Sequence, residues 1–178
     1  MTSQTIQTIQ TNKRVLFILL TSLFSLYLTV YPIFTIWLFF DGLVNKFSSL
    51  YFLWEIDTST GFSTPISLLL FTTVGAVLGG AILNIISFHK YFSVEKSFDI
   101  EYFWGFFFTP ILSAVVGIIV FALIQGGLLV LNGSLAESTE SINSSLGFTA
   151  IGCIAGYNWD MFIRKLQELS SVLNQKAD

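Results

Sequence analysis

The chain has 178 residues, of which 53% are hydrophobic and only 11% are charged, and its formal net charge is -3. Soluble domains carry about 25% charged residues, so this composition excludes an ordinary water-soluble domain. The length allows one compact helical unit and leaves no room for a separate soluble domain. The basic residues form no long run, which excludes a nucleic-acid footprint.

Four long stretches with almost no charge follow one another along the chain. A helix needs about 20 apolar residues to cross a hydrocarbon core of roughly 30 Å. We therefore predict an all-α integral membrane four-helix bundle, with spans at about residues 15–40, 66–88, 103–131 and 142–163.

The basic residues sort to one side of these spans. If both chain ends are cytoplasmic, Lys46 alone lies outside and all the other basic residues lie inside, as the positive-inside rule requires. The inside set is Lys13, Arg14, Lys90, Lys96, Arg164, Lys165 and Lys176. We expect a flexible cytoplasmic tail over 1–12, the membrane bundle over 13–165, and a cytoplasmic helical tail over 166–178.

The outer loop after the first span has a helical pattern. Apolar and aromatic residues recur at spacings of three and four, namely Leu43, Val44, Phe47, Leu50, Tyr51 and Trp54. This pattern predicts a short amphipathic helix on the outer membrane surface. A ligand-binding lid would look similar, but it needs convergent polar groups that Glu55, Asp57 and Thr58 suggest only weakly.

Small residues predict where helices pack closely. Thr21, Ser25 and Thr29 share one face of the first span, and the second span contains a GxxxG pattern. Without large side chains, helix backbones can approach each other, and dispersion then supplies the association that hydrophobicity cannot supply in lipid. The predicted packing residues are Gly75, Gly79, Gly80, Ser113, Gly117, Gly152 and Gly156.

Asn84, near the inner end of the second predicted span, is the most polar side chain of that span, and Gln125 is an amide in the outer half of the third. Such an amide can bond to a neighbouring helix or can face a shared polar axis in an assembly. We favour interhelical bonds and keep a pore lining as the alternative.

The fourth span is the shortest, because its strongly apolar part covers only residues 146–159. A re-entrant or surface helix is an alternative. A three-span topology, however, would place Arg164, Lys165 and Lys176 outside, against the charge bias. Extension of the helix to residue 163, with Asp160 paired to Arg164, makes it long enough.

The last segment also has a repeat in steps of four and three, which is typical of a coiled-coil seam. We predict an uninterrupted seam from the bilayer into the cytoplasm that mediates oligomerisation. Its residues are Phe148, Gly152, Ala155, Trp159, Phe162, Leu166, Leu169 and Leu173. The alternative is an amphipathic tail packed on the inner face of its own bundle.

No catalytic or metal-binding pattern occurs in the sequence, since the only His is His89 and the only Cys is Cys153. We therefore expect a non-enzymatic protein without a cofactor. The favoured function is a self-assembling membrane scaffold or signalling subunit. The alternatives are a homo-oligomeric channel with a neutral polar and apolar lining, and an accessory subunit of a larger complex.

The expected partners are the lipid bilayer, further copies of the chain and, as an alternative, another membrane protein. Nucleic acid is not an expected partner. The architecture is similar to that of small four-span prokaryotic membrane proteins with a helical cytoplasmic tail. This likeness implies a prokaryotic cytoplasmic membrane and carries over no functional residue.

Overall fold

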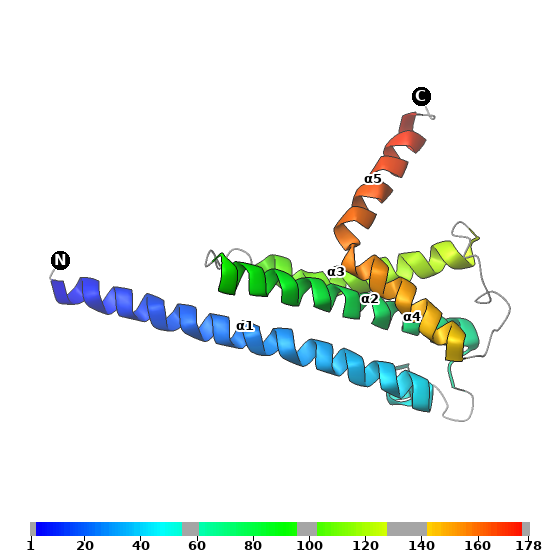
Figure 1. Cartoon of the computed structure of the whole chain (residues 1–178), viewed down its shortest axis with the longest axis horizontal. Coiled ribbons are helices and arrows are strands. Elements are labelled where there is room, and N and C mark those ends of the chain that lie inside the picture. The colour runs from blue at the N-terminus through cyan, green and yellow to red at the C-terminus, as the bar shows by residue number, and fades with distance from the viewer. Residues whose placement is uncertain (1–2, 55–60, 96–102, 128–141, 176–178) are drawn as a thin grey trace.

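The protein, seen here in a computed structural model that describes residues 3–54, 61–95, 103–127 and 142–175, is mostly helical over these residues (Figure 1). The α-helices are α1 (Ser3–Asn45), α2 (Thr64–His89), α3 (Phe103–Gln125), α4 (Ile142–Tyr157) and α5 (Trp159–Gln175). A 3-10 helix, η1 (Ser48–Trp54), follows α1, and a π-helical segment, η2 (Lys90–Val94), follows α2. No strand occurs in the described part, so the predicted all-α class is confirmed.

Within the described part of the chain, three helices are long and apolar enough to cross a membrane. They lie within Ile18–Asn45, Thr64–Val94 and Phe103–Gln125, with 28, 31 and 23 residues. These spans identify a membrane-embedded protein. The predicted fourth span differs, because α4 has only 16 residues and is about 24 Å long.

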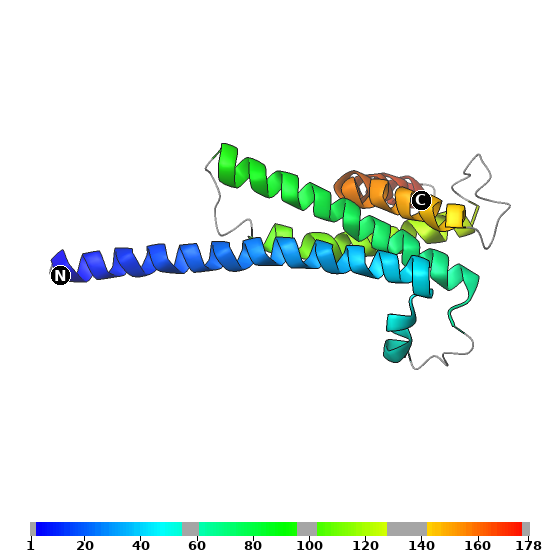
Figure 2. The same ribbon diagram turned by 60° about the horizontal axis from the view of Figure 1, so that its bottom comes forward.

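Helices α1 to α4 lie side by side, with α2 in contact with each of the other three (Figures 1 and 2). Helices α1 and α3 run in one direction, and α2 and α4 run in the other. We call the two ends of this body the Lys46 end, where α1 stops and α2 and α4 begin, and the Lys90 end, where α2 stops and α3 begins.

Helix α1 is longer than the sequence pattern predicts. It begins at Ser3, inside the segment expected to be a flexible tail, and it extends beyond the rest of the body (Figure 1). Thr and Gln are acceptable helix residues, and extension of an existing helix needs no new nucleation. At its other end α1 continues to Asn45, so the predicted outer-loop helix is confined to η1.

Helix α3 is shorter than predicted, because it ends at Gln125 rather than near residue 131. The Gly126 amide donates to the Ala122 carbonyl, and the Gly127 amide donates to the Ile124 carbonyl. Gly127 has a φ of 71°, the left-handed conformation that commonly ends a helix at glycine. Residues 128–131 of the predicted span lie outside the described residues.

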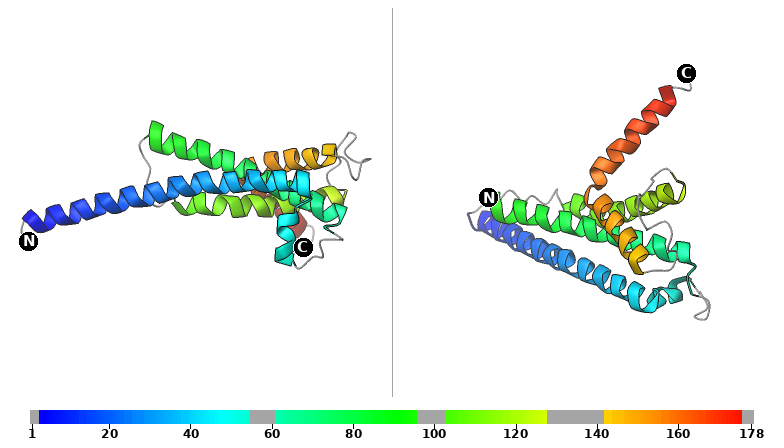
Figure 3. Two further views of the ribbon diagram at one scale, coloured as in Figure 1. Left: turned by 90° about the horizontal axis from the view of Figure 1, so that it is seen from below. Right: turned by 45° about the vertical axis from the view of Figure 1, so that its right-hand side comes forward.

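The predicted continuous helix over 142–163 is instead two helices that meet at Asn158. Helix α5 leaves the body sideways at this point (Figures 1 and 3). The Asn158 side chain donates to the Ile154 carbonyl at 2.9 Å, where it competes with the backbone amide of the same residue at 3.2 Å. Side-chain bonds of this kind disturb the helical ladder and bend helices.

Two apolar clusters hold the ends of the body together. The cluster at the Lys46 end includes Phe47, Phe71 and Phe148, from three different segments. The cluster at the Lys90 end joins Phe24 of α1 to Phe106 of α3, with ring centroids 5.5 Å apart. Small residues occupy the region between the two clusters, and they set the distance between α2, α3 and α4.

Candidate functional site

The closest helix contact joins α2 and α4. A Cβ atom placed on Gly75 would lie 2.9 Å from the Cα atom of Thr149, and one placed on Gly79 would lie 2.7 Å from the Tyr157 amide nitrogen. Real Cβ atoms do not approach backbone atoms so closely. The two glycines therefore let the α4 backbone lie directly against α2.

Helix α4 contributes an equivalent pair of glycines to the same contact. A Cβ atom on Gly152 would lie 2.9 Å from the Thr72 carbonyl carbon, and one on Gly156 would lie 2.6 Å from the Cα atom of Ala76. In each helix the two glycines are four residues apart, on one helical face. The carbonyl oxygens of each helix thus face glycines of the other.

Helix α3 completes this contact with the remaining predicted packing residues. A Cβ atom on Gly80 would overlap the Ser113 hydroxyl, and one on Gly117 would lie 2.8 Å from the Cβ of Ala76. The Ser113 hydroxyl also donates to the Gly156 carbonyl at 3.3 Å. The structure therefore brings all seven predicted packing residues together where α2, α3 and α4 meet.

The two predicted amides lie in different environments. Asn84 is 2% exposed, and its Nδ2 atom donates to the Phe106 carbonyl at 3.0 Å and to the Tyr31 hydroxyl at 3.2 Å. This amide therefore links α1, α2 and α3. Gln125 is the last residue of α3, where it is exposed at the Lys46 end of the body. Asn84 lies near the opposite end, close to where α2 stops. The structure does not bring the two amides together.

The predicted hydroxyl face of α1 lines a groove rather than a helix contact. Thr21, Ser25 and Thr29 border it on one side, and Phe88 and Phe92 border it on the other. The groove has a volume of about 590 Å³. Thr29 donates its hydroxyl to the Ser25 carbonyl of its own helix at 3.0 Å.

The predicted oligomerisation seam is divided between two environments. Phe148 and Gly152 pack against α2 within the same chain, and Ala155 follows them on α4. Trp159, Phe162 and Leu166 belong to α5 beyond the bend and are half-buried. The side chains of Leu169 and Leu173 lie outside the described residues. An uninterrupted straight seam is therefore not present, because the bend at Asn158 separates its halves.

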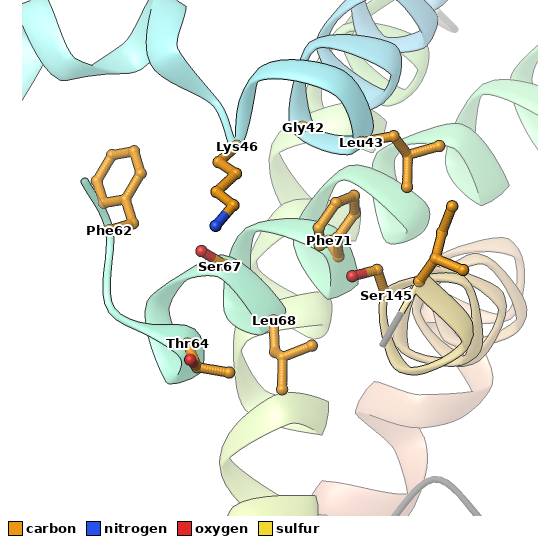
Figure 4. A pocket seen from close by; sticks show the side chains of 10 residues that line it. Gly42, Leu43, Lys46, Phe62, Thr64, Ser67, Leu68, Phe71 and Ser145 are labelled. Atoms are coloured by element: carbon orange, nitrogen blue, oxygen red, sulfur yellow. The ribbon is translucent and has the colours of Figure 1, made fainter. Parts of the chain in front are cut away.

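A cavity of about 270 Å³ opens at the Lys46 end, between α1, α2 and α4 (Figure 4). Its polar lining consists of the Lys46 ammonium group and the hydroxyls of Thr64, Ser67 and Ser145. Figure 4 shows the Lys46 side chain extending toward Ser67. The convergent polar groups that a ligand site requires are therefore present here, on residues that the sequence pattern does not single out.

An unusual turn places Lys46 at this cavity. Lys46 and Phe47 have φ angles of 52° and 61°, in the left-handed region that bulky residues rarely adopt. The Phe47 ring is fully buried against Gly42 and 4.8 Å from the Phe71 ring, and this burial offsets the strain. The turn changes the direction of the chain between α1 and η1 (Figure 2).

A buried carboxylate fixes the same turn from the other side. Asp41 accepts hydrogen bonds from Asn45 Nδ2 at 3.0 Å and from the Ser49 hydroxyl at 2.6 Å. The Ser49 backbone amide also donates to Asp41, at 3.3 Å. Asp41 thus holds η1 against the end of α1, and it does not line the cavity.

Sequence reasoning missed the cavity because its polar residues come from three separate segments. The only signal in the sequence is a single cation in the predicted outer loop, Lys46, and the charge pattern uses it only to orient the spans. Ser67 and Ser145 each lie in the first turn of a helix, where hydroxyl residues are common for local reasons. Among the described residues, no group of three or more His, Cys, Asp or Glu residues could hold a metal ion.

Comparisons of the chain with protein-family models, with curated proteins and with solved structures gave no match.

Proposed function

We propose that the protein is a non-enzymatic membrane scaffold with four spans and both termini in the cytoplasm, and that α5 lies in the inner membrane interface. The observation that carries this proposal is the bend at Asn158, which turns a strongly amphipathic helix sideways out of a membrane-embedded body (Figure 3). An apolar stripe on a helix in this position meets the headgroup region of the bilayer.

The two faces of α5 support an interfacial position. Phe162, Ile163 and Leu166 are half-buried on one side, whereas Asp160 and Arg164 are exposed. Arg164 and Asp160 form an exposed ion pair at 3.5 Å, and Lys165 pairs with Glu168 at 2.6 Å. The charged face is thus self-neutralised, so apolar burial rather than attraction to anionic lipid would hold α5 at the surface.

The interfacial position also accounts for the short fourth span. Helix α4 is about 24 Å long, and an interfacial helix sinks about 5–10 Å into the boundary of the bilayer. Together these lengths match a hydrocarbon core of roughly 30 Å. Because α2 and α4 run in the same direction and share their closest contact, both would enter the membrane from the Lys46 end.

Charge supports the orientation. In this topology the Lys90 end and the polar face of α5 lie inside, with the basic residues Lys90, Arg164 and Lys165. Lys46 alone lies outside. The scaffold would present the polar face of α5 and the protruding start of α1 to cytoplasmic partners.

Self-association is the second candidate function, and the α1 groove favours it. Small hydroxyl residues line this groove, and such residues let helices of different chains approach closely. In that case the apolar stripe of α5 would be covered by a second copy. A channel gains less support, because Asn84 is buried and bonded within one chain. If the protein is instead an accessory subunit, a helix of another protein would lie in the α1 groove.

Spin labels on α5 in nanodiscs test the interfacial position. In a Cys153→Ala background, labels at Ile163 and Leu166 sample the apolar stripe, and matched labels at the exposed Arg164 and Glu168 sample the opposite face. We expect the stripe labels to be accessible to oxygen and shielded from a water-soluble nickel complex, with the reverse for the matched labels.

Other results would reject the interfacial position. Labels on both faces that are equally accessible to the nickel complex would place α5 in water. Stripe labels shielded from both reagents, with dipolar coupling between copies, would instead support self-association through α5.

A further inference from the structure

The cavity at the Lys46 end has an electrostatic character that the scaffold function does not use. Ten residues line it, and Lys46 is the only charged one. Among the described residues, no acidic side chain lines the cavity beside the exposed Lys46, and the nearby Asp41 bonds to Asn45 and Ser49. The cavity therefore favours a negatively charged occupant.

Two helix N-termini add to this positive character. Thr64 and Ser67 lie in the first turn of α2, and Ile142 and Ser145 lie in the first turn of α4. The N-terminal end of a helix carries about half a positive charge on amides without helical partners. Ser63, which directly precedes α2, makes no side-chain capping bond. Its hydroxyl therefore does not accept hydrogen bonds from the backbone amides of the first turn of α2.

The rest of the lining indicates the shape of the occupant. The Thr64, Ser67 and Ser145 hydroxyls can donate to anionic oxygens, while Leu43, Leu68 and Phe71 form an apolar wall (Figure 4). A volume of about 270 Å³ is close to the lower end of small-molecule sites. It fits a small organic anion and excludes a peptide or a whole lipid.

We propose that this cavity binds an oxyanion, a carboxylate or phosphate group, on a short apolar body, with Lys46 as its charged partner. Bonds from charged donors to oxyanions are short and strong, and the hydroxyls of the two helix starts complete the coordination. The group can belong to a free small molecule or to the headgroup of an anionic lipid, because both present the same oxygens to Lys46.

Lysine NMR can locate the binding. Reductive ¹³C-methylation preserves the lysine charge, and the chain has six lysines, of which Lys46→Gln identifies one signal. The full chain in neutral detergent is titrated with hexanoate and with inorganic phosphate. It is then compared in phosphatidylcholine nanodiscs with and without phosphatidylglycerol. We expect a saturable shift of the Lys46 signal alone.

The arms of the experiment separate the two sources. Saturation by hexanoate or phosphate in detergent identifies a free anion, and a shift produced only by phosphatidylglycerol identifies a lipid headgroup. Lys46 signals that do not move in any arm, or that move only in parallel with the other five lysines, overturn the proposal.

Two variants show whether the cavity itself binds the anion. Ser67→Ala keeps the charge and removes one donor, and we expect about tenfold weaker binding, the loss typical of one hydrogen bond to a charged group. Ser87→Ala, on the same helix at the Lys90 end, is the matched control and should leave the affinity unchanged. Equal affinities for the two variants would place the anion outside the cavity.

Discussion

Replacement of Gly156 by Ala should loosen the contact on which the helical body depends. The new Cβ atom would lie 2.6 Å from the Cα atom of Ala76, whereas carbon atoms in contact are about 3.5–4.0 Å apart. Helices α2 and α4 must therefore separate by about 1 Å. A gap of this size forfeits a quarter to a half of the dispersion energy of each contact that it opens.

The loss in stability follows from this separation. Overpacking of a close contact typically costs about 1–3 kcal/mol, and the 3.3 Å bond from Ser113 to the Gly156 carbonyl would lengthen as well. We therefore expect Gly156→Ala to lower the free energy of unfolding by roughly 2 kcal/mol.

Gly105→Ala is the matched control, because a Cβ atom at Gly105 has no neighbour within 4 Å. It should be neutral or should stabilise α3 by up to about 1 kcal/mol through higher helix propensity. Reversible unfolding in mixed micelles with increasing dodecyl sulfate, followed by circular dichroism, measures both variants. Equal stability of the Gly156→Ala and Gly105→Ala proteins would refute the close-contact account.

Three further changes test other parts of the structure. Asn84→Leu should lower the free energy of unfolding by about 1 kcal/mol in the same assay, the usual size of an interhelical hydrogen bond in a membrane, and an unchanged value would show that its bonds contribute nothing. Lys46→Gly should raise the free energy of unfolding by about 1 kcal/mol because glycine adopts a positive φ without strain, and a decrease would contradict the strained turn. Asn158→Leu should straighten the junction of α4 and α5, which would bring a spin label at Gln167 closer to one at Phe92, and an unchanged distance would show that Asn158 does not cause the bend.

The positions of close helix contact could be predicted from the sequence because they depend on a local property. A glycine inside an apolar helix has few structural roles other than to let a second helix backbone approach closely. Gly75 and Gly79 therefore indicate a packing face before the partner is known. The sequence could not identify α4 as that partner, since Gly152 and Gly156 also fit a contact with a second copy of the chain.

Helix ends were harder to predict because they depend on single residues. The apolar run of α3 continues past Gln125, and only the left-handed Gly127 shows that the helix stops. The 3.5-residue pattern likewise continues across Asn158, since a periodic pattern specifies a face and not the direction of the helix axis. The side-chain bond to the Ile154 carbonyl, which accompanies the bend, leaves no trace in that pattern.

The cavity at the Lys46 end required the tertiary structure. Its cation and hydroxyls are separated by up to 99 residues along the chain, from Lys46 to Ser145. They converge because α2 and α4 begin at the same end of the body. No local pattern in either helix indicates that convergence.

Cysteine labelling tests the four-span topology most directly. In a Cys153→Ala background, single cysteines at Ser48 and Gln175 leave every basic residue in place, so the orientation signal is preserved. In intact cells a membrane-impermeant thiol reagent should label Ser48→Cys, and it should label Gln175→Cys only after permeabilisation. Labelling of Gln175→Cys from outside would mean that α4 does not cross the membrane, and it would contradict the proposed position of α5.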